Sequence, residues 1–128
     1  MCIATVVLDL NRTHAAHPQW LGHARFHVVW QTVTVALLCA FAGGLIWYPG
    51  PLQAERFYAA TLLACLPVFG FFAALIARRI YGGTLSDPGG IPPVVVSVMG
   101  QSHRIDLNLV AEIAGLAVLI LAVAFYRA

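Results

Sequence analysis

The sequence predicts an all-α integral membrane protein, a helical bundle of three full spans plus a short or truncated N-terminal helix. Of its 128 residues, 61% are hydrophobic and only 9% are charged, which leaves too little polar surface to cover a water-soluble globule. Three long uncharged runs supply the spans. We expect one transmembrane domain, residues 1–128, because three or four helices of about 20 residues each use nearly all of the chain.

The first two spans are expected over residues 28–48 and 57–77. Both runs carry no charge, and both are long enough to cross about 30 Å of hydrocarbon at about 1.5 Å per residue. The first ends at Trp47 and Tyr48, a pair typical of the membrane interface, and helix breakers follow.

The third span is expected over residues 107–126, and Asp106 precedes it as the expected helix cap. Two further apolar segments are too short to cross the bilayer, namely the eight residues before Asp9 and residues 91–99. Because the second contains Pro92 and Pro93, we expect it to be re-entrant or interfacial.

The basic residues indicate an orientation. All seven are arginines, and the predicted spans place five of them on one side of the membrane, namely Arg12, Arg25, Arg78, Arg79 and Arg104. The positive-inside rule makes this side cytoplasmic. The five histidines fall on the same side. The arginines are scattered rather than clustered on one face, which excludes nucleic acid as a partner.

Two polar ridges are expected to enter the bilayer from that side. The ridge of the first span consists of Trp20, His23, His27, Gln31 and Thr34, whose spacings of three and four put them on one helical face. The ridge of the third span repeats every four residues and consists of Arg104, Asn108 and Glu112. We expect the two ridges to face each other and to form a polar pocket near the cytoplasmic face.

The pocket has a functional and a structural interpretation. A carboxyl group within a span costs about 2.5–3.5 kcal/mol on insertion scales, so Glu112 needs a partner. The functional interpretation makes His27 and Glu112 a proton-transfer pair that acts on a small hydrophobic molecule, and its binding residues are His23, Gln31, Asn108 and Trp20. The structural interpretation is that the same side chains only form interhelical hydrogen bonds.

Two alternatives to this function remain open. His23 and His27, one helical turn apart, have the spacing for a shared metal ion, and His14, His17 or Glu112 would complete the ligands of a single Zn, Cu or Fe ion. The other alternative is a non-catalytic accessory or scaffold subunit of a larger membrane complex. Small residues on the first and third spans would permit close helix contacts, so we expect a homo-oligomer or a partner subunit.

The segment from Asp9 to His27 resembles a known signature. It reads Asp-Leu-Asn-Arg-Thr-His-Ala-Ala-His-Pro-Gln-Trp-Leu-Gly-His-Ala-Arg-Phe-His. It is similar to the signature of an uncharacterised family of small polytopic membrane proteins, in which Asp-x-Asn-x-Thr-His leads through Pro-x-Trp to His-Ala-Arg-Phe-His. The resemblance implies a bundle of about four helices with a span ahead of the Asp, and it implies no activity.

Overall fold

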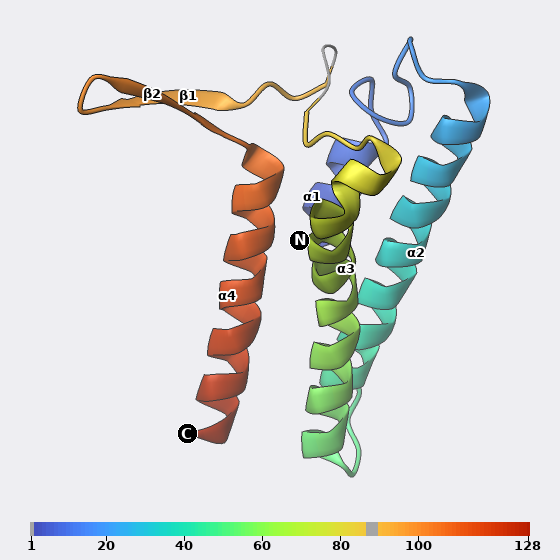
Figure 1. The fold of residues 1–128 in the computed structure, drawn as a ribbon. Helices are drawn as coiled ribbons and strands as arrows, with labels where there is room; N and C mark the ends of the chain where they lie inside the picture. Colours follow the sequence, from blue (N-terminus) through green and yellow to red (C-terminus); the bar gives the residue numbers. More distant parts are fainter. Residues whose placement is uncertain (1, 87–89) are drawn as a thin grey trace.

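The computed structural model describes residues 2–86 and 90–128, and it confirms the predicted fold class. Four helices and one small hairpin follow each other along the chain (Figure 1). They are α1 (Cys2–Asp9), α2 (Gly22–Trp47), α3 (Gln53–Tyr81), β1 (Val94–Val98), β2 (Gln101–Ile105) and α4 (Leu107–Arg127).

Three of the helices, α2, α3 and α4, are long and apolar enough to cross a membrane. α2 and α3 begin or end several residues beyond the predicted spans, and they include Arg25, Arg56, Arg78 and Arg79. The uncharged runs mark only the part of a helix that suits hydrocarbon, whereas backbone hydrogen bonding continues into the headgroup region. α4 begins at the expected residue, Leu107.

The long helices alternate in direction, and α3 lies in the middle. α3 packs against α2 on one side and α4 on the other, while α1 packs against α2 (Figure 1). Five of the seven arginines therefore lie at one end of the bundle, together with the loop before α2 and the hairpin. We call this the arginine-rich end. Arg56 and Arg127, at the start of α3 and the end of α4, lie at the other end.

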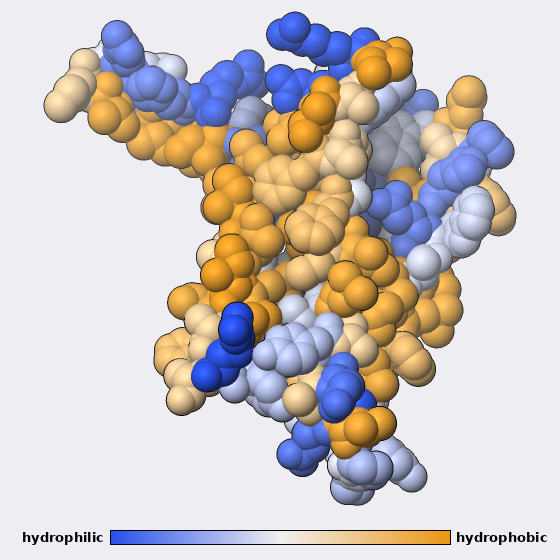
Figure 2. All heavy atoms as spheres, turned by 60° about the horizontal axis from the view of Figure 1, so that its bottom comes forward, coloured by the Kyte–Doolittle hydropathy of each residue, from blue (hydrophilic) through white to orange (hydrophobic). Residues whose placement is uncertain are grey.

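Few side chains are buried, and most of the large apolar ones are exposed. Figure 2 shows hydrophobic residues spread over the flanks of the helices. In a membrane this surface faces lipid, which is as apolar as the side chains themselves, so the helices are held together by packing and polar contacts. In the described part of the chain the buried residues are His17, Thr32, Ala42, Ala60, Val68 and Gly115.

The turn between α2 and α3 is fastened by Arg56. Its Nε donates to the carbonyl of Leu45 at 2.9 Å, and its Nη2 donates to the carbonyl of Tyr48. Leu45 belongs to the last turn of α2 and Tyr48 is its C-terminal cap, and a cation at this end is favourable for the helix dipole. At the same end, the ring of Tyr126 on α4 stacks on Phe57 of α3, with the centroids 3.9 Å apart.

The segment expected to be re-entrant or interfacial contains the first strand of a β-hairpin. β1 pairs antiparallel with β2, from Val94 opposite Ile105 to Val98 opposite Gln101. Met99 and Gly100 form the turn, both with positive φ (51° and 79°), as a two-residue type I′ hairpin turn requires. The hairpin was not predicted from the sequence, because β2 is polar and shows no apolar run.

Asp106 caps α4 as predicted. Its Oδ1 accepts hydrogen bonds from the backbone N–H groups of Asn108, at 2.9 Å, and Leu109, at 3.1 Å. These two groups have no partner inside the helix, so the side chain satisfies donors that the first turn leaves free. Because Asp106 directly follows Ile105, the cap also fixes where the hairpin joins the third span.

Candidate functional site

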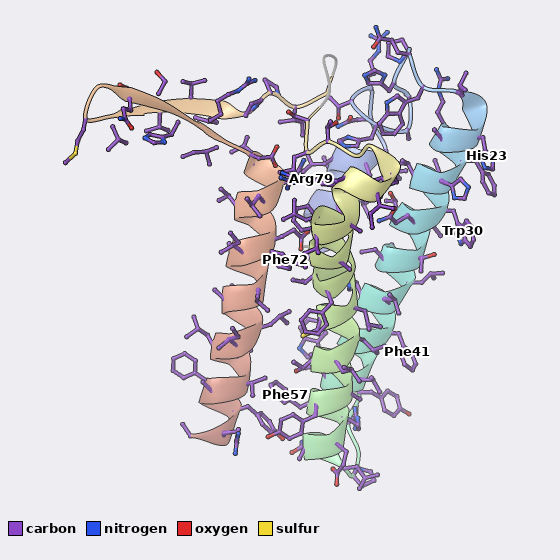
Figure 3. All side chains as sticks on the ribbon, viewed as in Figure 1. His23, Trp30, Phe41, Phe57, Phe72 and Arg79 are labelled. Carbon is purple, nitrogen blue, oxygen red and sulfur yellow. The ribbon has the colours of Figure 1, made fainter. Side chains whose placement is uncertain are left out.

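A pair of histidines lies on the first turns of α2, as the spacing predicted. The Nε2 atoms of His23 and His27 are 3.1 Å apart, and the ring planes are almost perpendicular at 87°. When both rings are neutral, the Nε2–H group of one donates a hydrogen bond to the Nε2 of the other. Both side chains are exposed, and Figure 3 shows His23 on the side of α2 that faces away from α3.

Aromatic side chains flank the pair. The ring of His27 lies 5.7 Å from that of Trp30 and 6.1 Å from that of Phe26, and both aromatic residues are exposed at about 60%. Trp30 points outward from α2 on the same side as His23 (Figure 3). The histidine pair therefore sits in an apolar, aromatic surface that is open to its surroundings.

The depth of the pair in the bilayer follows from the length of α2. The interfacial residue Trp47 ends the helix, and about 20 residues of helix span the hydrocarbon. Counting back from Trp47 places the far hydrocarbon boundary close to His27. His23 then lies at the level of the lipid headgroups, while Gln31, exposed on the same helix, lies about one turn below the boundary.

Trp20 does not continue the ridge of α2, because it precedes the helix and belongs to the loop after α1. Its ring lies 5.8 Å from that of His14, edge to face, and 5.4 Å from that of His17. It is half-buried between them. The predicted binding residue Trp20 is thus a packing residue of this loop.

The loop is held by a network of short-range hydrogen bonds. Oδ1 of Asn11 accepts from the backbone N–H of Thr13 at 2.7 Å and from its hydroxyl at 2.6 Å. The Thr13 hydroxyl also lies 2.8 Å from Nδ1 of His14. Asn and Thr side chains that bond the nearby backbone stabilise such turns. His14 is therefore engaged in the loop.

His17, one of the residues expected to complete a metal site with His23 and His27, is buried in this loop. It is 2% exposed, and its Nδ1 accepts from the backbone N–H of Gln19 at 3.2 Å. Nη2 of Arg25, on α2, donates to the His17 carbonyl at 2.8 Å. The His17 Nε2 is buried without a hydrogen-bond partner in the described part of the chain.

A polar contact connects α1 to α2. The hydroxyl of Thr32, which is 1% exposed, lies 2.8 Å from the Val28 carbonyl and 3.2 Å from Oδ2 of Asp9. Its one proton is shared between these two acceptors. Asp9, the first residue of the resemblance segment, therefore fixes the end of α1 to α2.

The two predicted ridges do not face each other in one chain. Asn108 and Glu112 are half-buried on α4, which packs against α3, whereas His23, His27 and Gln31 are exposed on α2. Arg104 lies in β2, so it is not part of the α4 ridge. Helical spacing predicts which residues share a face, but it does not tell which helix that face meets. For this reason the expectation that the two ridges face each other was wrong.

Glu112 is nevertheless a notable side chain. Its Oε2 is buried and has no hydrogen-bond partner among residues 2–86 and 90–128. A polar group in that position is costly unless something satisfies it. Glu112 is therefore a second position that calls for a partner, separate from the histidine pair.

The predicted three-histidine metal set is not formed. Across the described ranges, no group of three or more His, Cys, Asp or Glu side chains is arranged to hold a metal ion. His23 and His27 supply two nitrogens, and His14 belongs to the loop network.

A depression of about 440 Å³ lies at the opposite end of the bundle. It is lined by residues 45–49, Gln53, Arg56, Phe57 and Tyr126. Its one cation, Arg56, already donates to two carbonyls at the end of α2, those of Leu45 and Tyr48. The depression therefore offers aromatic surface but no free charge, and it is far along the bundle from the histidines.

No family model matches this chain, and no curated protein or solved structure matches it either.

Proposed function

We propose that this membrane protein binds a small hydrophobic molecule that approaches sideways from the bilayer, with the histidine pair as its polar contact. The observation that carries the proposal is the convergence of the His23 and His27 Nε2 atoms, 3.1 Å apart, on an exposed aromatic surface. An apolar surface with a few convergent polar groups is typical of small-molecule sites. At the hydrocarbon boundary, such a surface is accessible to a molecule dissolved in the leaflet.

The pair also supports proton exchange with the bound molecule. Imidazole can donate and accept a proton near neutral pH, and general acid–base catalysis uses this property. His27 is then the proton-transfer group and His23 orients it. Glu112, the other half of the predicted pair, lies on α4, and α3 stands between α4 and α2, so the proposed proton exchange rests on the two histidines.

The second candidate function is that of an accessory or scaffold subunit that works as an oligomer. The specific observation is that Gln31, a polar side chain, is exposed on α2 below the hydrocarbon boundary. Contact between copies would satisfy polar groups that lipid cannot.

A third candidate is a single Zn, Cu or Fe ion. Two nitrogens bound to one tetrahedral Zn²⁺ at about 2.0–2.1 Å are about 3.3 Å apart, close to the 3.1 Å between the two Nε2 atoms. His23 and His27 would hold the ion, and the remaining ligands would come from a second copy or from the bound molecule.

We also propose that the arginine-rich end is cytoplasmic, on the positive-inside rule. From their likeness to its signature, we propose as well that residues 9–27 are related to an uncharacterised membrane family. Neither changes which residues form the site.

Native mass spectrometry of the protein extracted into lipid nanodiscs tests these candidates together. We compare the natural chain with His23→Ala, His27→Ala and, as the matched control, His103→Ala, which removes an exposed histidine of the hairpin. The proposal expects a retained organic mass in the natural chain and in the control, and its loss in the other two variants.

The other outcomes each favour a different function. A retained mass equal to one metal ion, lost with either His23 or His27, supports the metal candidate. Multiples of the chain mass that fall apart in His27→Ala support the assembly candidate. A retained molecule that is unaffected by both substitutions, or no retained molecule at all, overturns the proposed binding function.

A further inference from the structure

The hairpin occupies an unusual position at the arginine-rich end. It leaves the bundle beside the start of α4 and extends beyond α4, across the direction of the helices (Figure 1). All five residues of each strand are exposed. Apart from the chain connections at its two ends, the hairpin therefore has little support from the helices.

The two faces of the hairpin differ in chemistry. Side chains alternate along a strand, and the pairing sets which of them share a face. The first face carries four apolar residues with two polar ones, and its members are Val94, Val96, Val98, Gln101, His103 and Ile105. The second face carries Val95, Ser97, Ser102 and Arg104. We call them the valine face and the serine face.

The hydrophobic side of the hairpin is turned toward the level of the helices. Figure 2 shows orange atoms along that side and blue atoms on the opposite side. The apolar side of the hairpin begins next to the lipid-facing surface of α4, because only Asp106 separates Ile105 from the first residue of that span. The hairpin cannot move far from the membrane surface while Asp106 caps α4.

A hairpin of this size needs support from a surface. Two isolated strands are marginally stable in water at best, and they require a packed face to persist. Here the exposed fractions are 44% for Val94, 37% for Val96, 51% for Val98 and 100% for Met99 at the turn. The surface that lies next to these residues in a membrane is the bilayer into which α4 descends.

We propose that residues 94–105 lie flat on the leaflet at the arginine-rich end, with the valine face at the boundary of headgroups and acyl chains. From Asp106 the strands reach about 17 Å outward at about 3.4 Å per residue, so the hairpin covers lipid beside α4. The serine face remains in water, and Arg104 on it can bend down to lipid phosphates, as long cationic side chains do. This inference is independent of any ligand of the histidine pair.

The alternation of the faces gives a sharp test. An environment-sensitive fluorescent amino acid replaces Val96 or, as the matched control, its neighbour Ser97, in nanodiscs that hold one chain each. The lipid is either ordinary or brominated in its acyl chains. The proposal expects a blue-shifted emission at position 96 that is quenched by brominated lipid, in keeping with burial of about 5–10 Å. At position 97 the emission stays water-like and is not quenched.

A second pair of positions, Val98 and Ser102, repeats the comparison if the first label prevents strand pairing. Water-like emission at both faces would overturn the proposal, because the hairpin would then stand in solution. A blue shift at the valine face without quenching would also overturn it, since a second copy or another protein would then cover that face. Equal quenching at both faces would overturn it as well, because the serine face would then not remain in water.

Discussion

Replacing Asp106 with Ala removes the N-terminal cap of α4 at the point where the hairpin meets the span. The two hydrogen bonds that Oδ1 accepts from the Asn108 and Leu109 amides disappear. The rest of α4 keeps its intrahelical bonds, so the effect is local. We expect the first turn of α4 to open more often while the helix as a whole persists.

The size of the effect follows from the energy of such caps. Exchanging a capping Asp for Ala costs about 0.5–2 kcal/mol, typically about 1 kcal/mol. Because 1.4 kcal/mol corresponds to about a tenfold change in an equilibrium constant, the two amides should exchange with deuterium about 2- to 30-fold faster. Hydrogen–deuterium exchange followed by NMR in nanodiscs measures this at single residues. The amide of Val118, in the middle of α4, serves as the internal reference.

The Asp106→Asn variant is the control, since its side-chain oxygen can still accept both hydrogen bonds. It loses only the charge, which is worth about 0.3–1 kcal/mol near a helix N-terminus, so its exchange should rise less than in Asp106→Ala. Unchanged exchange at Asn108 and Leu109 in Asp106→Ala would refute the reasoning. An equal rise at Val118 would also refute it, because the whole helix would then be affected.

Three further predictions concern the packing of the bundle, and resistance to unfolding by sodium dodecyl sulfate measures each of them. Arg56→Met removes a cation that fastens the end of α2, and it should cost up to about 3 kcal/mol; a loss no larger than that of an exposed surface change would contradict the geometry described. Thr32→Val should cost about 1 kcal/mol by removing the hydroxyl that bonds Asp9, whereas Thr32→Ser should be close to neutral. Ala60 is 1% exposed, so Ala60→Leu puts a large side chain into a packed position, and this overpacking should lower the free energy of unfolding by about 1–3 kcal/mol. Full stability would mean that the neighbouring helices can separate at little cost.

The sequence predicted the spans well because hydrocarbon imposes a simple rule on each residue separately. A run without charge marks the membrane part of a helix whatever its neighbours are. The ends of α2 and α3 were less predictable, since charged residues such as Arg25 and Arg78 stay helical in the headgroup region. The cap at Asp106 was predictable because it depends on local backbone groups alone.

The candidate site was predicted only in its local part. The contact between His23 and His27 follows from helical spacing, which is a property of one helix. The separation of Glu112 from them depends on the order of α2, α3 and α4 in space, and nothing in the helical period encodes that order. His17 is a similar case, because its burial arises from a turn whose hydrogen bonds join residues of the loop to Arg25.

The scarcity of buried side chains has a consequence for how this chain tolerates change. Outside the loop of residues 10–21, buried positions such as Thr32, Ala42, Ala60 and Val68 are widely spaced along the helices. Between them, one large apolar residue can replace another at little cost, because lipid adapts to either shape as a solid core does not. Substitutions should therefore be tolerated over most of the lipid-facing surface. They should be tolerated less in the loop and at these few contacts. A search for relatives of this chain is best guided by the polar pattern from Asp9 to His27 rather than by overall identity.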